Sequence, residues 1–412
     1  MQTETPAKSS ERVRIPLRDQ LPVYAAGIFS NGAAHLATVI VPLWVLMIDP
    51  SPLMVGIALG SRHFLPVLLS IHGGALMDRL GIRRVMIAFA VVGAIVPFLF
   101  PVFPFFAAVI ILQMLTGIAM AIGWIGTQAH VGVLMKGDPV YAGRVTFFNR
   151  FSTLAGPPAV GAAWDLFGPW GGFGFLGLWA IGLLVACILL PFPVRNGDVD
   201  RPDNFSRITF RDVLPRMSDY VAAFRLMTIP AIAFIVAVTI LRHASNGIQT
   251  SFYVVYLESI GMSGTVIGTL IAASSILGGV GSLSAGWLAR TFTSYRVLVL
   301  SISCAILMIT ITPLLGTFLL LLVASGLRGG FMGASQPLLI SLLAQSVGQA
   351  QGKGVGLRTT ANRLAVLVTP VLMGALAEVI GIEASFYVMG GLLIILMLGV
   401  ATQYRTALAA KS

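Results

Sequence analysis

Long apolar segments constrain the fold of this chain more than any other feature of its sequence. Twelve such runs can be counted, and each is close to the roughly 20 residues that a helix needs to span a bilayer. Lipid offers the backbone no hydrogen-bond partners, so each run is expected to cross the membrane as an α-helix. The expected spans are residues 21–48, 53–77, 85–103, 105–132, 143–167, 171–192, 229–257, 264–288, 296–315, 317–345, 355–379 and 384–403.

The composition agrees with a membrane protein that crosses the bilayer many times. Only 10% of the 412 residues are charged and 57% are apolar, whereas soluble domains carry about 25% charged residues. The first twenty residues are polar and lack the apolar core of a signal peptide, so we expect this segment to be retained. The sequence therefore predicts an all-α protein with the lipid bilayer as its solvent.

The net charge of +11 follows the expected topology and not a nucleic-acid surface. Most of the 26 Lys and Arg residues lie in alternate connections between apolar runs or in the two tails, and the other connections contain none. This positive-inside pattern predicts an inner or plasma membrane protein with both termini cytoplasmic. Six arginines instead lie within or at the ends of apolar runs, namely Arg62, Arg150, Arg242, Arg328, Arg358 and Arg363.

An internal duplication divides the chain into two halves. The stretch GRVTFFNRFSTLAGPPAVGAAWDLFG from Gly143 matches GLRTTANRLAVLVTPVLMGALAEVIG from Gly356 at a constant offset of 213. We predict two pseudo-symmetric six-helix bundles, an architecture suited to alternating access. The matched pairs are Asn149 and Asn362, Arg150 and Arg363, Pro157 and Pro370, Gly161 and Gly374, and Asp165 and Glu378.

The polar segment between the sixth and seventh runs separates the halves. We expect a cytoplasmic tail over 1–20, a first bundle over 21–192, a cytoplasmic linker over 193–228, a second bundle over 229–403 and a second cytoplasmic tail over 404–412. The second part of the linker has the pattern of an amphipathic helix at the membrane surface.

The connection between the second and third runs, GGALMDRLGIRRVM, resembles the loop signature of the major facilitator superfamily. The residues that carry the resemblance are Gly74, Asp78, Arg79, Gly81, Arg83 and Arg84. The resemblance implies the twelve-helix major facilitator fold and a loop that latches the two halves together in the outward-facing state. The loop also makes sense as a topology anchor, because basic residues hold a connection at the anionic leaflet.

The stretch GPPAVGA, residues 156–162, resembles the helix-five signature of proton-driven exporters in the drug/proton-antiporter-like branch of this family. Three residues separate Pro157 from Gly161, where the usual signature has two. The resemblance implies export. Simple helix packing is the alternative, because proline and glycine bend and closely pack membrane helices whatever the direction of transport.

Polar residues inside the apolar runs mark a candidate substrate cavity. Arg242, Asn246 and Gln249 are spaced to lie on one face of the seventh helix. No Asp or Glu occurs at this depth, so we predict a wet, electropositive cavity that is completed by an anionic ligand. Additional polar residues lie on the first, second and tenth helices, namely Asn31, His35, Arg62, His63 and Arg328.

Other roles remain open for several of these residues. Arg150 and Arg363, with Asn149 and Asn362 beside them, either have a structural or gate role near the cytoplasmic helix ends, such as capping carbonyls or holding the halves closed, or contact the ligand. His35, His63 and His243 are candidates for the coupling proton, because imidazole titrates near neutral pH, or they are structural.

We therefore predict a secondary active transporter that moves a small organic or amphiphilic anion by alternating access, coupled to protons. Export by proton antiport is favoured over uptake. The alternatives are a proton-linked importer, an exporter of neutral or cationic drugs, and a non-transporting assembly factor or lipid-binding scaffold.

The same residues argue against catalysis. The sequence shows no catalytic nucleophile with a general base beside it, no nucleotide-binding loop and no cluster of metal ligands. We therefore expect no enzyme activity, cofactor or metal. The expected partners are the substrate, protons and lipid, with the chain acting as a monomer and without nucleic acid.

Overall fold

The computed structural model describes residues 15–134, 139–191, 194–195, 198–199, 225–347 and 351–409, and nearly all of them are helical. The N-terminal half contains α1 (Leu17–Ile48), α2 (Pro52–Ser61), α3 (Phe64–Leu80), α4 (Ile82–Val102), α5 (Phe106–Val133) and α6 (Pro139–Leu189). The C-terminal half contains η2 (Leu226–Thr228), α8 (Pro230–Gln249), α9 (Phe252–Ser259), α10 (Gly264–Thr291), α11 (Ser294–Thr310), η3 (Thr312–Leu314), α12 (Phe318–Val347), α13 (Gln351–Ile380) and α14 (Ile382–Ala409).

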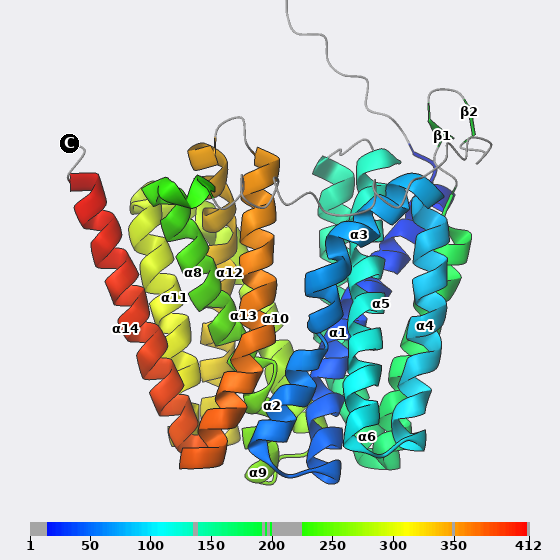
Figure 1. Ribbon diagram of the computed structural model, residues 1–412, viewed down its shortest axis with the longest axis horizontal. Helices are drawn as coiled ribbons and strands as arrows, with labels where there is room; N and C mark the ends of the chain where they lie inside the picture. Colours follow the sequence, from blue (N-terminus) through cyan, green and yellow to red (C-terminus); the bar gives the residue numbers. More distant parts are fainter. Residues whose placement is uncertain are drawn as a thin grey trace, which may run out of the picture.

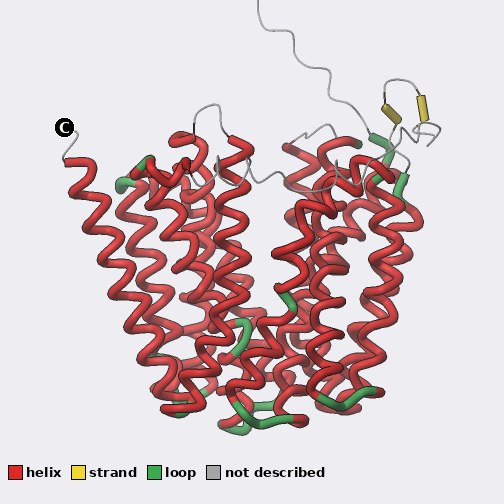
Figure 2. Tube along the Cα trace, in the orientation of Figure 1, coloured by secondary structure: helices red, strands yellow, loops and turns green. Residues whose placement is uncertain are grey.

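The helices form two bundles that lie side by side, with α1 to α6 in one and α8 to α14 in the other (Figure 1). The ribbons diverge toward the end where α1 begins and α14 ends, which we call the tail side. They approach each other at the opposite end, which we call the contact side, where α2 lies beside α13. Figure 2 shows the described loops gathered mainly at these two ends, as expected for helices that cross a membrane.

The predicted set of twelve spanning helices is present. Among the described residues, ten helical segments are long and apolar enough to cross a membrane. One of them, residues 151–189, contains two spans, because α6 folds back at Gly168, where φ is 61° and ψ is −151°. Glycine adopts this conformation without the steric cost that a Cβ would add. The shorter apolar helix Tyr295–Thr310 completes the set.

Two of the spans are interrupted partway along their length. The second span breaks between α2 and α3, where Arg62 and His63 form a turn. The seventh span breaks between α8 and α9, where Thr250 and Ser251 form a turn. Broken helices at membrane depth are tolerated where the freed backbone groups are buried in protein or line a cavity. Both breaks therefore mark places where the backbone itself can take part in a site.

The surface and the interior are both apolar, as in a protein surrounded by lipid. Leu283 and Val379 remain 87% and 82% exposed, respectively, and many other large apolar side chains are also exposed. In the interior of the first bundle, Phe100 stacks on Phe173 with ring centroids 4.6 Å apart. An exposed apolar surface of this extent is unusual for a soluble monomer and is satisfied by lipid tails.

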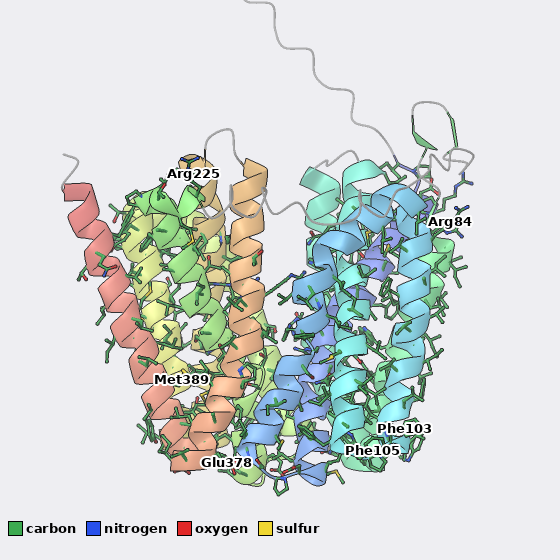
Figure 3. All side chains as sticks on the ribbon, in the orientation of Figure 1. Arg84, Phe103, Phe105, Arg225, Glu378 and Met389 are labelled. Atoms are coloured by element: carbon green, nitrogen blue, oxygen red, sulfur yellow. The ribbon has the colours of Figure 1, made fainter. Side chains whose placement is uncertain are left out.

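The polar ends of the bundles differ in charge. Figure 3 places Arg84 and Arg225 at the tail side and Glu378 at the contact side, where Phe103 and Phe105 also lie. In the expected linker, β1 (Val194–Arg195) and β2 (Asp198–Val199) pair in antiparallel fashion. The predicted amphipathic segment of the linker and most of the N-terminal tail lie outside the described residues.

Candidate functional site

Two pairs of helices, α2 with α13 and α6 with α10, form the most extensive contacts between the bundles, and they lie at the contact side. On α2, a Cβ added at Gly56 would collide with the carbonyl oxygen of Pro370 on α13. On α6, a Cβ added at Gly161 would collide with the carbonyl oxygen of Gly264 on α10. Backbones approach this closely only where side chains are absent. Four residues predicted to belong to the gate lie at these contacts, namely Pro157, Gly161, Pro370 and Gly374.

A carboxylate reinforces each of these contacts. Asp165 on α6 accepts hydrogen bonds at 2.8 Å from the backbone N–H groups of Gly264 and Thr265, and at 2.6 Å from the Thr265 hydroxyl. Glu378 on α13 accepts from the Ser51 hydroxyl at 2.9 Å and from the Leu53 N–H at 3.3 Å. Each carboxylate therefore caps the N-terminus of a helix in the other bundle, where the helix dipole favours negative charge.

Sequence reasoning finds these two carboxylates as a duplicated pair but misses their role as caps. The signal that could have revealed the role is the position of Ser51 and Ser263. Each serine stands just before an expected helix, and its side chain accepts a hydrogen bond from that helix N-terminus. A carboxylate from another helix can then complete the cap, but which helix lies opposite is a property of the tertiary structure.

The broken second span brings a positive charge next to the boundary between the bundles. Gly117 on α5 packs directly against the Arg62 carbonyl, and Arg62 Nη1 donates to the Ala34 carbonyl on α1 at 3.5 Å. His63, the next residue, is close enough to interact electrostatically with Arg363 on α13 of the other bundle. The side chains of Arg62, His63 and Arg363 are all half-buried. Three basic groups from both bundles thus gather between α2 and α13.

A second basic group lies between helices of the C-terminal bundle. Arg242 on α8 donates from Nε to the Ser335 hydroxyl at 2.9 Å and from Nη2 to the Met332 carbonyl at 3.1 Å, both on α12. Its Nη1 lies 3.4 Å from His243 Nε2, and Arg358 on α13 is within electrostatic range. The guanidinium is therefore held in place by neutral oxygen atoms that satisfy its donors and leave its charge uncompensated.

The other predicted cavity residues are divided between two environments. Asn246 on α8, and Asn31 and His35 on α1, are half-buried. Gln249 and Arg328 instead are buried and line a pocket inside the C-terminal bundle, between α8, α9, α11 and α12. The polar stripe of the seventh span therefore extends from Arg242, which contacts α12, to Gln249 at the helix break.

Asn149 and its duplicate lie in different surroundings. Asn149 on α6 is 7% exposed, and a Cβ added at Gly27 on α1 would lie 2.8 Å from its Oδ1 atom. Asn362 on α13 is half-buried. Arg150 lies within α6, but its side chain is outside the described part of the structure. The tight packing of Asn149 on α1 agrees with a structural role for this residue.

The loop motif joins α3 to α4 at the tail side. Gly81 forms the connection with a φ of 86°, which glycine adopts readily. Arg83 donates to the Ile188 carbonyl near the end of α6, and Arg84 is exposed. The Arg83 bond ties the loop to α6 of its own bundle. The backbones of Gly74, Asp78 and Arg79 belong to α3, and their surroundings lie outside the described part.

In the part of the chain that the structure describes, no carboxylate forms an ion pair with these arginines. Four carboxylates in the described bundles, those of Asp165, Glu258, Glu378 and Glu383, are exposed. The ion pair found among the described residues joins Arg18 to its neighbour Asp19 at 3.7 Å, close to the start of α1. The described interior therefore contains arginine side chains without a carboxylate to neutralise them.

The comparisons with known proteins agree with this architecture. The model of the Major Facilitator Superfamily matches residues 23–243 and 235–408. A solved structure of a mutant form of the nucleoside transporter NupG is similar with a TM-score of 0.76 and 14% identity, over 93% of this chain and 99% of that one. A second NupG structure gives a TM-score of 0.72 and 13% identity, over 93% and 98%. No curated protein matches the chain in sequence.

At this level of identity the NupG structures support the fold alone, whereas the family model covers almost the whole chain. The multi-pass helical architecture, the two bundles and the family match together indicate a transporter and not an enzyme. The protein belongs to the major facilitator superfamily of membrane transporters.

Proposed function

We propose that this transporter carries small organic or amphiphilic anions, coupled to protons, by alternating access. The observation that carries the proposal is the placement of Arg62, Arg242 and Arg363 within spanning segments, beside helix breaks or inter-helix contacts, with no ion pair to a carboxylate among the described residues. Arginine at the centre of a membrane helix costs about 2.5–3.5 kcal/mol. Because this free-energy cost arises at several positions, we infer that the positive charges serve the function of the protein.

An anionic substrate would neutralise the positive charge of these arginines. Carbonyl and hydroxyl oxygens satisfy donors of Arg62 and Arg242, but they carry no net charge. Guanidinium groups bind carboxylates and phosphates through two parallel hydrogen bonds, which gives both affinity and orientation. We therefore propose carboxylate- or phosphate-bearing compounds as substrates, with Arg62 and Arg363 contributing from opposite bundles and Arg242 from α8.

His243 is the proposed site of the coupling proton. Its Nε2 atom faces Arg242 Nη1 at 3.4 Å and can accept a hydrogen bond from that donor only when the ring is neutral. A bound anion beside Arg242 would offset the charge of the guanidinium and favour a protonated ring. Anion and proton would then increase each other's affinity by the same factor. His63 next to Arg62 and Arg363, and His35 on α1, are the competing candidates.

The direction of transport has two candidates. The case for export rests on Pro157 and Gly161, but both residues lie in the contact between α6 and α10, where close packing accounts for them in either direction. The contact between Arg242 and His243 favours joint movement of anion and proton, which an inward proton gradient would drive as uptake. We propose uptake on this ground, with export as the alternative.

The proposed orientation follows the charge of the two ends. Arg84 and Arg225 at the tail side, opposite Glu378 at the contact side, favour a cytoplasmic tail side by the positive-inside rule. The bundles would then be closed toward the exterior in this structure. We further propose that the protein works as a monomer in the inner or plasma membrane, because one pair of bundles forms a complete transport unit.

Transport by the purified protein in proteoliposomes tests the proposal. Uptake and counterflow would be measured for carboxylates, phosphates, cations and a neutral nucleoside, with pH gradients of each sign. NupG is a nucleoside transporter, so the nucleoside tests whether the shared fold extends to substrate class. Saturable transport of anions that is stimulated by an inside-alkaline gradient is expected. Transport of cations or nucleosides without any anion transport would overturn the proposal.

A further inference from the structure

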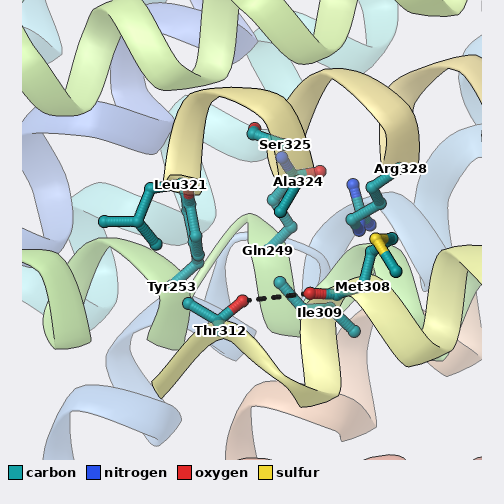
Figure 4. A pocket seen from close by; sticks show the side chains of 9 residues that line it. All are labelled: Gln249, Tyr253, Met308, Ile309, Thr312, Leu321, Ala324, Ser325 and Arg328. Atoms are coloured by element: carbon teal, nitrogen blue, oxygen red, sulfur yellow. Dashed lines mark hydrogen bonds between the residues drawn. The ribbon is translucent and has the colours of Figure 1, made fainter. Parts of the chain in front are cut away.

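The C-terminal bundle contains a small internal pocket next to the break in the seventh span. It is lined by Gln249 at the end of α8, by Tyr253 at the start of α9, and by Arg328 and Ser325 of α12 (Figure 4). Apolar side chains of α11 and α12 form much of the remaining wall. The space free of atoms is about 200 Å³ including its mouth, and its interior admits about one water-sized particle.

Arg328 brings a positive charge into this pocket. The side chain is only 2% exposed, and its Nη2 atom donates to the Ser245 carbonyl at 3.1 Å. Its Nε atom is buried and has no hydrogen-bond partner among the described residues. None of the residues that line the pocket is acidic. The positive charge of Arg328 is thus buried, and no acidic side chain lines the pocket beside it.

A second buried donor faces the same space. Tyr253 is 3% exposed, and its hydroxyl makes no hydrogen bond of ordinary geometry in the described part of the chain. The nearby Ser325 hydroxyl instead donates to the Leu270 carbonyl at 2.8 Å. Buried polar groups in native proteins nearly always have a partner, so two such groups in one pocket point to a bound species. A water molecule would satisfy the donors, but it would leave the guanidinium charge uncompensated.

We propose that this pocket binds a small inorganic monovalent anion of the chloride type, held by Arg328 and Tyr253 with the Gln249 amide beside it. The charge of the site selects an anion, and the size of the pocket excludes the organic anions proposed as transport substrates. The residues that line the pocket do not include Arg62, Arg242 or Arg363, the groups proposed to bind substrate, so the inference does not depend on the proposed function.

The bound anion would stabilise the interrupted seventh span. Gln249 and Tyr253 stand on the two sides of the turn at Thr250 and Ser251, and Arg328 faces the same pocket from α12. An anion between them would hold α8, α9 and α12 together. Ligands that bind only the folded state stabilise it increasingly as their concentration rises. The folded transporter should therefore be more stable in chloride than in a large anion such as gluconate.

Crystals of the full-length protein grown in bromide provide the direct test. An anomalous bromide peak within hydrogen-bond distance of Arg328 and Tyr253 is expected. An empty pocket or a water molecule there, with bromide at saturating concentration, would overturn the proposal. This test uses the unmodified protein and so does not depend on whether a variant folds.

Thermal unfolding of the purified protein gives a second readout. Replacing gluconate by chloride at constant ionic strength should raise the melting temperature by at least about 2 °C in a saturable manner. Arg328→Met should remove this chloride dependence, whereas Arg296→Met, a loss of charge at an exposed arginine of α11 outside the pocket, should retain it. Equal chloride dependence in Arg328→Met and the unmodified protein would contradict the assignment.

Discussion

At the scale of single residues, the central feature is arginine whose hydrogen bonds are satisfied and whose charge is not. Arg242 shows this most clearly, because Ser335 and Met332 on α12 accept two of its donors while it forms no ion pair with a described carboxylate. Such a group is oriented in advance for an anion, because the bonds to α12 fix the plane of the guanidinium. The proposed affinity for anions should therefore be lost when this one side chain is removed.

Replacement of Arg242 by alanine is expected to lower anion affinity by about 10- to 100-fold, since hydrogen bonds to charged groups contribute about 1.5–3 kcal/mol. The folded yield should stay nearly unchanged, because the Ser335 hydroxyl already donates to the Met332 carbonyl at 2.8 Å. Binding of radiolabelled anion to purified protein measures the effect. Arg242→Lys, which keeps the charge without the planar fork, should retain part of the affinity. A variant that fails to fold would make Arg242 structural.

Replacement of His243 by glutamine tests the proposed proton site. The amide oxygen of glutamine can still accept from Arg242, but the side chain does not titrate. Accumulation driven by a pH gradient should disappear, while counterflow, which needs no gradient, should remain close to that of the unmodified protein. Gradient-driven accumulation that survives in this variant would transfer the role to His63 or His35.

Part of this residue-level chemistry is visible in the sequence. Arg62 and Arg242 stand out because a charge within an apolar run is costly, so their importance can be inferred without coordinates. Tyr253 and Ser335 give no such signal, because neither carries a charge that must be explained. Their roles depend on which helix lies opposite, and that is a property of the tertiary structure.

At the scale of helices, the two inter-bundle contacts repeat one design. In each, a glycine-rich surface lets two backbones meet, and a carboxylate caps a helix N-terminus across the boundary. Asp165 caps α10 and Glu378 caps α2. Because the two contacts are related by the duplication, we expect them to form and break together in the proposed alternating-access cycle.

Neutralising either cap should open the contact side. Asp165→Asn and Glu378→Gln remove the charge that favours the helix N-terminus, and each should shift the equilibrium toward the open form by about 0.5–2 kcal/mol. Distances between spin labels on α6 and α10, or on α2 and α13, measure the shift. Glu258→Gln is the matched control, because Glu258 is an exposed carboxylate on α9 that belongs to neither cap. Unchanged distance distributions in both variants would refute the view that Asp165 and Glu378 hold the contact side closed.

A bulky residue at the glycine contact should have a larger effect. Gly161→Leu would place a side chain against the Gly264 carbonyl and hold α6 away from α10. Closure at the contact side, and with it the transport cycle, should be blocked. Gly174→Leu on the same helix α6 meets open space and should transport normally. Normal turnover in Gly161→Leu would show that closure does not require this contact.

Sequence patterns predict the helices far better than their interruptions. The span through Arg62 reads as one apolar run, yet it breaks there, and Gly117 allows the Arg62 carbonyl to pack against α5. Gly168 falls in an expected connection, and its conformation explains how two spans can lie so close in sequence. Where a helix breaks depends on the residues of other helices that pack against it. The pattern of apolar residues along one helix does not contain that information.

At the scale of the whole molecule, two bundles share contacts at one side and carry unneutralised arginines near their boundary. Family membership establishes a transporter, and the duplication explains why the contacts come in pairs. The substrate is a property of the side chains at the boundary and not of the fold, because one fold hosts many functions. The NupG structures, at 13–14% identity, share the fold while most of the aligned residues differ.

The most direct test of the claim that uncompensated arginines define the substrate compares anions and cations of similar size in proteoliposomes that contain the purified protein. We predict saturable counterflow of carboxylate or phosphate compounds, lost in Arg242→Ala, and no counterflow of matched cations. Counterflow of cations with no response to any anion would contradict that claim.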